Sequence, residues 1–199
     1  MHTMKTSILF LLLGSCLITQ AQSDRRDNDL FYSITAGAGI GHSPNFEEST
    51  NGPGAMLGFS LHKNKSMATM GYRATGEAQL LSPATPAHTM SSLELSYGRM
   101  LTDKKLSISL NAGIAMVQRL ERGEFLYADP GFFAARYYEK VKSFTLGVPI
   151  SLKTLLCLTK HFGFGVEGYY NINRLDNFYG LNLVASFGKY QFIRKKAKL

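Results

Sequence analysis

The strongest constraint in this sequence is an alternation of apolar and small polar residues with a period of two, which begins at Leu30 and runs almost to the end of the chain. Residues 106–119 show it most clearly, because their odd-numbered positions are mainly serine, asparagine and glycine. Successive side chains of a β-strand point to opposite faces, whereas a helix brings residues three and four apart onto one face. The pattern therefore predicts an all-β protein. The apolar even-numbered positions are Leu106, Ile108, Leu110, Ala112, Ile114 and Met116.

Eight segments carry this alternation, and we expect each to form one strand. Most reach the ~9 to 11 residues that a membrane-spanning strand needs. Long connections (residues 43–54 and 121–140) alternate with tight ones (64–65 and 102–105), which predicts an eight-stranded antiparallel up-and-down barrel, a meander. Residues 154–161 are too many for a tight turn, so we expect their flanking strands to extend. The predicted strands are 31–41, 55–63, 66–80, 89–101, 106–120, 141–153, 162–172 and 178–189.

Glycine indicates which face of these strands lines the interior. A soluble barrel and a membrane barrel both show the period of two. The apolar face points inward in a soluble barrel and outward in a membrane barrel. Glycine weakens a water-facing strand, whereas the lumen of a narrow barrel needs the space that glycine leaves. We therefore expect a transmembrane β-barrel with a polar lumen, and a secreted soluble barrel or sandwich is the alternative. Twelve of the 19 glycines lie on the polar face: Gly37, Gly39, Gly41, Gly58, Gly71, Gly98, Gly113, Gly147, Gly163, Gly165, Gly180 and Gly188.

The polar face also carries three basic and three acidic side chains, which in a narrow lumen could pair into a closed network. On a soluble protein the same groups would be solvated. The apolar face carries aromatic residues near both strand ends, as expected of interfacial girdles. The charged residues are Arg73, Arg119, Lys153, Glu77, Glu94 and Glu167. The predicted girdles are Tyr32, Phe59, Tyr97, Phe162 and Phe187 at the periplasmic rim, and Phe144, Tyr170 and Tyr179 at the outer rim.

The N-terminal segment has the pattern of an export signal. Lys5 precedes an apolar run, and Thr19 and Ala21 are small residues at the positions that signal peptidase reads, so we expect a signal peptide over residues 1–21. The alternative is a lipoprotein signal that makes Cys16 a lipidated first residue. The apolar run is too short for a membrane-spanning helix, which needs ~20 residues. We expect the barrel over residues 22–190 and a basic tail over 191–199, with Cys157 the remaining cysteine.

Three segments resemble the small porin-like outer-membrane β-barrel family: residues 35–41 (TAGAGIG), 162–171 (FGFGVEGYYN) and 179–187. The resemblance covers the chain from Leu30 to about Phe187. It implies insertion into the outer membrane of a Gram-negative bacterium by the barrel assembly machinery, which reads a last strand ending in an aromatic residue. Phe187 is the first choice for that residue, with Tyr190 and Phe192 as alternatives.

No catalytic or metal-binding pattern emerges from the sequence. Barrels that act as enzymes on lipid A place histidine, serine and an acid near the outer rim, and His42 with Ser43 or His88 with Ser91 are the candidates here. Neither pair has a third partner at a defining spacing. The histidines are scattered, which predicts no metal site, and no cofactor motif is present. Although the net charge is +8, an exported barrel does not meet nucleic acid.

We therefore expect a monomeric, non-enzymatic outer-membrane protein with a structural or surface-binding role, in contact with outer-membrane lipids. A small porin-like channel is the alternative, and a secreted lipocalin-like carrier is a further one. Residues 121–140 are the longest predicted connection and are expected to be a surface loop that contacts an extracellular ligand. The candidate contacts are its six aromatic residues, Phe125, Tyr127, Phe132, Phe133, Tyr137 and Tyr138.

Overall fold

The computed structural model describes residues 30–44, 51–77, 84–101, 105–130, 134–159 and 161–188. The predicted signal peptide, the basic tail and the candidate contacts Phe132 and Phe133 lie outside these residues. In the described ranges no helix is long and apolar enough to cross a membrane.

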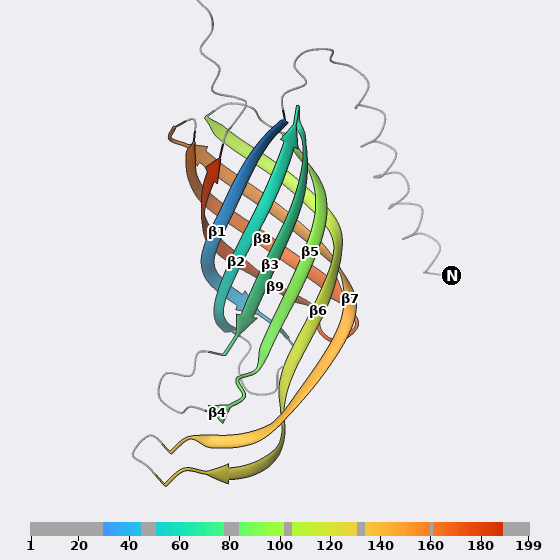
Figure 1. The fold of residues 1–199 in the computed structure, drawn as a ribbon, viewed down its shortest axis with the longest axis vertical. Helices are drawn as coiled ribbons and strands as arrows, with labels where there is room; N and C mark the ends of the chain where they lie inside the picture. Colours follow the sequence, from blue (N-terminus) through green and yellow to red (C-terminus); the bar gives the residue numbers. More distant parts are fainter. Residues whose placement is uncertain are drawn as a thin grey trace, which may run out of the picture.

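Eight long strands form one closed antiparallel ring, in the order β1–β2–β3–β5–β6–β7–β8–β9 with β9 pairing back onto β1 (Figure 1). This confirms the predicted fold class, an eight-stranded up-and-down barrel. A ninth strand, β4, has two residues and pairs in parallel with the start of β7 at one end of the barrel. The strands are β1 (Leu30–His42), β2 (Asn51–Lys63), β3 (Ser66–Gly76), β4 (Ala84–Thr85), β5 (Thr89–Met100), β6 (Leu106–Ala128), β7 (Arg136–Cys157), β8 (Phe162–Asn173) and β9 (Phe178–Gly188).

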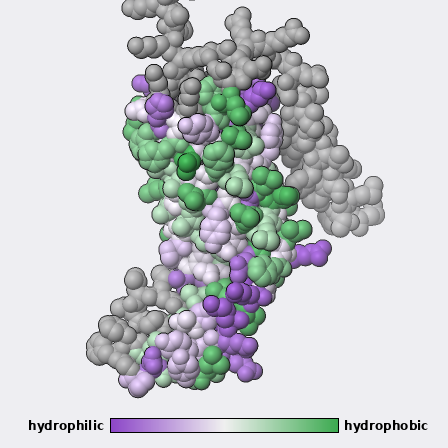
Figure 2. Space-filling model, in the orientation of Figure 1, coloured by the Kyte–Doolittle hydropathy of each residue, from purple (hydrophilic) through white to green (hydrophobic). Residues whose placement is uncertain are grey.

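The two faces of the ring differ in polarity as the sequence predicts. Inward positions hold buried serine, threonine, asparagine and charged side chains, whereas outward positions hold large apolar side chains that no part of the described chain covers. Leu146, Leu183 and Ile114 are 78%, 72% and 67% exposed. Figure 2 shows apolar residues spread over the side of the barrel, with hydrophilic residues gathered where β6 and β7 leave it. The predicted girdle aromatics share this outward face, at 40–60% exposure for all except the half-buried Phe162.

Some inward positions require glycine because a neighbouring backbone lies too close for any side chain. This is a second reason for glycine on the inward face, besides the limited width of the lumen. A Cβ built on Gly39 would lie 1.9 Å from the Leu181 carbonyl oxygen, and one on Gly113 would lie 2.1 Å from the Leu95 carbonyl oxygen. Any side chain at these positions would force two paired strands apart. Gly58 differs, because its nearest neighbour would be 3.7 Å away.

Residues 121–140 are not a loop, which corrects the sequence prediction. β6 continues to Ala128 and β7 begins at Arg136, so the two strands form a hairpin that projects beyond the barrel (Figure 1). The register shifts between Arg122 and Phe125 and again before Tyr127, so the period of two is interrupted. Outside the barrel neither face of the hairpin needs to be uniformly apolar, so the alternation that marks the other strands disappears.

Other boundaries differ by smaller amounts. β2 begins four residues earlier than predicted, at Asn51, and β3 ends at Gly76 instead of residue 80. β7 extends to Cys157, as expected of the strands flanking residues 154–161, whereas β8 begins at Phe162, where the alternation alone placed it.

Candidate functional site

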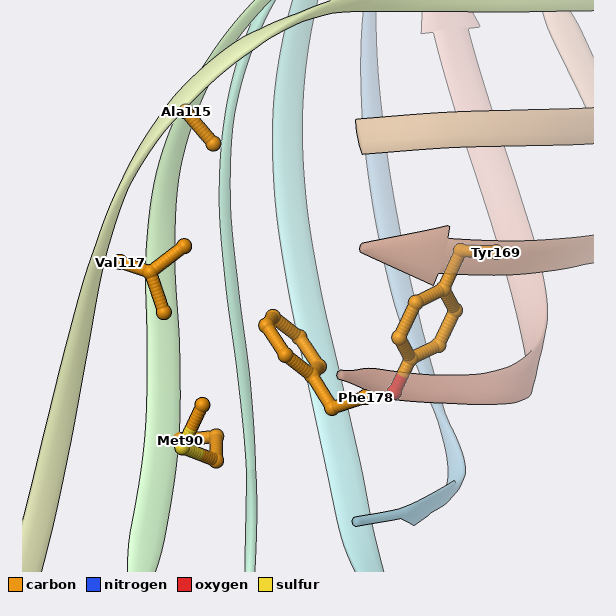
Figure 3. Close-up of a cluster of buried hydrophobic side chains, with 5 residues drawn as sticks. All are labelled: Met90, Ala115, Val117, Tyr169 and Phe178. Carbon is orange, nitrogen blue, oxygen red and sulfur yellow. The ribbon is translucent and has the colours of Figure 1, made fainter. Parts of the chain in front are cut away.

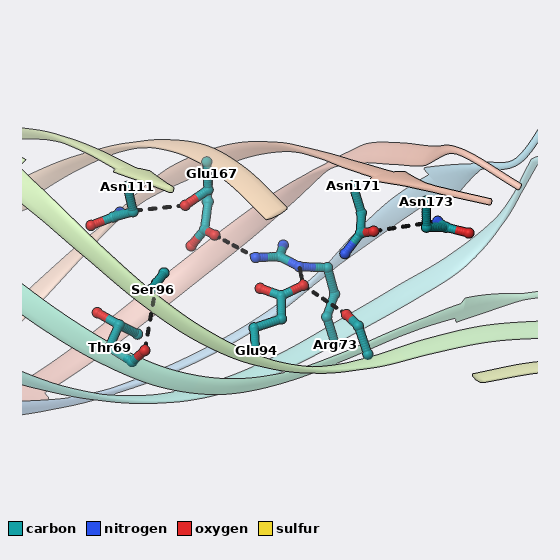
Figure 4. A network of polar contacts seen from close by, with 10 residues as sticks. Thr69, Arg73, Glu94, Ser96, Asn111, Glu167, Asn171 and Asn173 are labelled. Carbon is teal, nitrogen blue, oxygen red and sulfur yellow. Dashed lines mark hydrogen bonds and ion pairs between the residues drawn. The ribbon is translucent and has the colours of Figure 1, made fainter. Parts of the chain in front are cut away.

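The centre of the lumen holds a buried ionic cluster built on Arg73 (Figure 4). Its Nε lies 3.3 Å from Oε1 of Glu94, and its Nη2 lies 2.7 Å from Oε1 of Glu167. The Ser92 hydroxyl donates to the same Glu94 oxygen at 2.7 Å, and the Tyr169 ring lies 4.0 Å from the guanidinium carbon. Strands β3, β5 and β8 each contribute one charged residue, so the cluster ties the paired strands β3 and β5 to β8, which pairs with neither of them.

Lys153 completes the charge balance of this cluster. It is buried on β7 and, with Arg73, Glu94 and Glu167, lines a cavity of about 30 Å³ inside the lumen. Two cations and two anions therefore share a space that holds only a few water molecules, since one water needs ~10–15 Å³. A second cavity, of about 10 Å³, touches Lys153 from the side of the tight turns.

The structure places the remaining two predicted lumen charges elsewhere. Glu77 forms an ion pair with Arg122, on the projecting part of β6. Arg119 forms an ion pair with Glu121 and donates from Nη1 to the Leu175 carbonyl at 3.1 Å. The sequence thus indicated the face on which the six charges lie, but four of them meet in one cluster and two pair with residues assigned to a loop.

Apolar layers lie on both sides of the ionic cluster. Toward the long connections, five buried side chains fill the lumen: Met90, Ala115, Val117, Tyr169 and Phe178 (Figure 3). Toward the tight turns, a second set of buried residues is contributed by four strands: Phe31, Met67, Met100, Leu155 and Cys157. Sequence reasoning missed these layers because their members lie on the polar face and are scattered along the chain. Side chains therefore fill the lumen at three successive levels.

The connections next to the outer apolar layer are held by hydrogen bonds. The Ser43 hydroxyl bonds to the Asp176 carboxylate, and the Asn173 amide donates to the Asp176 carbonyl at 2.6 Å. His42 Nδ1 lies 3.0 Å from the Asn51 side-chain oxygen. Ser43 is thus bonded to Asp176 and His42 to Asn51, so the first candidate pair for catalysis is engaged in separate contacts.

The second candidate pair, His88 and Ser91, lies at the start of β5. The backbone nitrogen and carbonyl of His88 both bond to Glu77. Ser91 lies on the outward side of β5, because the inward positions of that strand are even-numbered. Within the described ranges, no group of three histidine, cysteine or acidic side chains could hold a metal ion.

The projecting hairpin carries four of the six predicted contact residues, in two cross-strand pairs. The rings of Tyr127 and Tyr137 stack with centroids 4.5 Å apart, and those of Phe125 and Tyr138 meet edge to face at 5.5 Å. The Tyr137 hydroxyl donates to the Asp129 carboxylate, whose charge raises the pKa of Tyr137 above its ordinary value. The sequence thus indicates the aromatic residues as candidate contacts. Their pairing depends on the β6–β7 hairpin, which the sequence pattern does not predict.

Arg122 fixes the base of the hairpin to the barrel. Besides its ion pair with Glu77, its Nε donates to the Pro86 carbonyl at 3.3 Å, and its guanidinium lies 5.6 Å from the Tyr138 ring. β4 adds a backbone connection at Arg136. The hairpin is therefore an anchored extension of the barrel wall that presents exposed aromatic residues.

Comparison with solved structures identifies the class of fold. Neisserial surface protein A, NspA, aligns with a TM-score of 0.57 at 11% identity, over 79% of this chain and 96% of NspA. Ail, the attachment invasion locus protein of Yersinia pestis, aligns with a TM-score of 0.52 at 11% identity, over 80% and 98%. The N-terminal barrel domain of Pseudomonas aeruginosa OprF aligns with a TM-score of 0.50 at 10% identity, over 78% and 96%.

The chain therefore has the fold of the small eight-stranded transmembrane β-barrels of outer membranes. No protein-family model and no curated protein matches its sequence. At 10–11% identity the likeness shows the fold alone.

Proposed function

We propose that this chain is a non-enzymatic integral protein of the bacterial outer membrane, with a structural or surface-binding role that its projecting hairpin performs. The observation that carries the proposal is the outward face of the barrel, where leucine, isoleucine and aromatic side chains on all eight strands are exposed together. A soluble protein rarely exposes a contiguous apolar patch larger than a few hundred Å². A hydrocarbon environment removes this cost, and the closed ring leaves no unpaired strand edge within it.

The ends of the barrel support one orientation. The chain enters at Leu30 and leaves at Gly188 on the side of the tight turns, and the long connections lie on the other side (Figure 1). Barrels of this class have short periplasmic turns and longer extracellular connections. We therefore place the β6–β7 hairpin outside the cell. Lys63, Lys65 and Lys105 then face the periplasm.

The filled lumen supports a binding or structural role over permeation. The two cavities that the described residues enclose beside the ionic cluster measure about 30 and 10 Å³, far below the ≈300–1,000 Å³ of typical ligand pockets. The same cavities disfavour a lipocalin-like carrier. Among the structural neighbours, Ail was crystallised with the heparin analogue sucrose octasulfate, so this fold can present a binding surface.

Assembly of the barrel completes the proposal. Phe187 is the penultimate residue of β9 and points outward, which suits an aromatic signal read by the barrel assembly machinery. Tyr190 and Phe192 lie outside the described residues. We propose that the protein acts as a monomer, because the ring closes within one chain.

Envelope fractionation combined with a heat-modifiability gel tests this proposal. We expect the protein in the outer-membrane fraction, with a compact form that migrates faster before boiling than after it. Replacing residues 125–137 by an Asn-Gly turn is expected to preserve both properties while abolishing the surface binding that the hairpin performs. Recovery of the unmodified protein in the soluble periplasmic fraction would contradict the proposal.

A further inference from the structure

The outward face of β7 changes from apolar to basic where the strand leaves the barrel. Leu146 and Phe144 are 78% and 60% exposed, and the next two residues on the same face, Lys142 and Lys140, are exposed as well. Arg174, also exposed, directly follows β8, the strand paired with β7. Two exposed apolar side chains therefore lie next to three exposed cations, on neighbouring strands at one rim of the barrel.

Backbone pairing locates this rim relative to the membrane. β7 and β8 pair only as far as Gly147 and Asn173, and between Gly147 and the β4 contact at Tyr137 no described strand covers that edge of β7. An unpaired strand edge does not occur in hydrocarbon exposed to lipid. The hydrocarbon boundary therefore lies near Gly147, with Arg174 at the boundary. Lys142 is five residues from Gly147, which corresponds to a distance of up to ~16 Å along the strand at ~3.3 Å per residue.

Within the described residues, none of Lys140, Lys142 and Arg174 forms an ion pair. Glu139 neighbours Lys140 in sequence but belongs to the opposite face of β7. Arg122, which lies across from Lys140 in the register, is itself paired with Glu77. The outward surface of β7 beyond Phe144 and Leu146 therefore carries exposed cations, and with Arg174 they extend from the hydrocarbon boundary outward to Lys140.

We propose that Lys140, Lys142 and Arg174 form a binding site for the phosphate groups of an anionic outer-leaflet lipid, whose acyl chains begin at Leu146 and whose headgroup lies beside Phe144. A guanidinium binds phosphate in a bidentate manner, and lysine stems reach downward along an apolar surface while keeping their ammonium groups polar. The apolar residues favour a lipid over free phosphate, because a soluble anion gains nothing from them. The inference rests on the membrane orientation given under Proposed function.

The experiment compares two charge-matched triple variants of the full mature protein in mild detergent. The test variant is Lys140→Gln, Lys142→Gln and Arg174→Gln. The control, at the opposite rim, is Lys63→Gln, Lys65→Gln and Lys105→Gln. Native mass spectrometry measures binding of bisphosphorylated lipid A and of the same lipid without phosphates. A heat-modifiability gel verifies that each variant is folded, and Lys142→Gln alone serves if the triple variant is not.

We expect the test variant to bind bisphosphorylated lipid A at least tenfold more weakly than the unmodified protein and the control to differ by less than twofold. Removing the lipid phosphates is expected to weaken binding to the unmodified protein to a similar extent, and excess inorganic phosphate is expected not to compete. Equal losses in both variants would show general attraction to basic rims and overturn the site. A loss in the control alone would overturn it too, whereas failure of the unmodified protein to enter bilayers would instead overturn the proposed function.

Discussion

Replacement of Arg73 by alanine tests whether the lumen is closed to water. Arg73 is 4% exposed and forms ion pairs with both Glu94 and Glu167, so the variant leaves two buried carboxylates with Lys153 as the cation that shares their cavity. Removing one partner of a buried ion pair typically costs 3–5 kcal/mol, because the remaining charge stays buried without compensation. We expect Arg73→Ala to lower the free energy of unfolding by about 3–5 kcal/mol.

A double variant separates the charge from the packing. Arg73→Met combined with Glu94→Gln removes one cation and one anion and leaves Lys153 with Glu167. Replacing a buried ion pair by neutral groups of similar volume is often close to neutral, so we expect the double variant to be at least ~2 kcal/mol more stable than Arg73→Ala. Urea unfolding in phosphatidylcholine vesicles, followed by loss of the compact gel form, measures both. A loss below ~1 kcal/mol for Arg73→Ala, the range of solvent-exposed pairs, would show that water reaches the carboxylates and would refute a closed lumen.

Three further predictions concern the barrel wall and the hairpin. Gly39→Ala is expected to block assembly, because its Cβ would lie 1.9 Å from a backbone oxygen, whereas Gly58→Ala has 3.7 Å of space and should assemble normally on a heat-modifiability gel. Trypsin added to intact cells is expected to cut after the exposed Arg136, and an intact hairpin with cleavage at the opposite rim would reverse the orientation. Asp129→Asn removes the charge that raises the pKa of Tyr137, so tyrosinate absorbance from this residue should appear at lower pH; an unchanged titration would contradict their contact.

The alternation that the membrane imposes could be read directly from the sequence. The face of each residue between Leu106 and Val117 follows from its position alone, because lipid contact requires apolar side chains on one face and the narrow lumen favours small or polar ones on the other. The same reasoning placed Arg73, Glu94, Lys153 and Glu167 on the inward face. Which of them meet depends on the register of four different strands, and no local pattern encodes that register.

The hairpin was missed for a related physical reason. Beyond the membrane both faces of β6 and β7 contact water, so their side chains no longer alternate, and the register shift after Arg122 displaces the pattern further. Arg122 itself carries no signal in the sequence, since its ion pair with Glu77 joins segments 45 residues apart. No local pattern marks the cations near Lys142, because their place relative to the barrel follows from where the β7–β8 pairing ends.

A single introduced tryptophan tests most directly whether the outward face lies in hydrocarbon. The sequence contains no tryptophan, so Leu183→Trp places one reporter at the middle of β9, where the leucine is 72% exposed. Tyr127→Trp on the hairpin serves as the control. In vesicles of lipids brominated on their acyl chains, we predict strong quenching at position 183 and little at position 127. Weak quenching at position 183, together with efficient quenching by aqueous acrylamide, would contradict the membrane barrel.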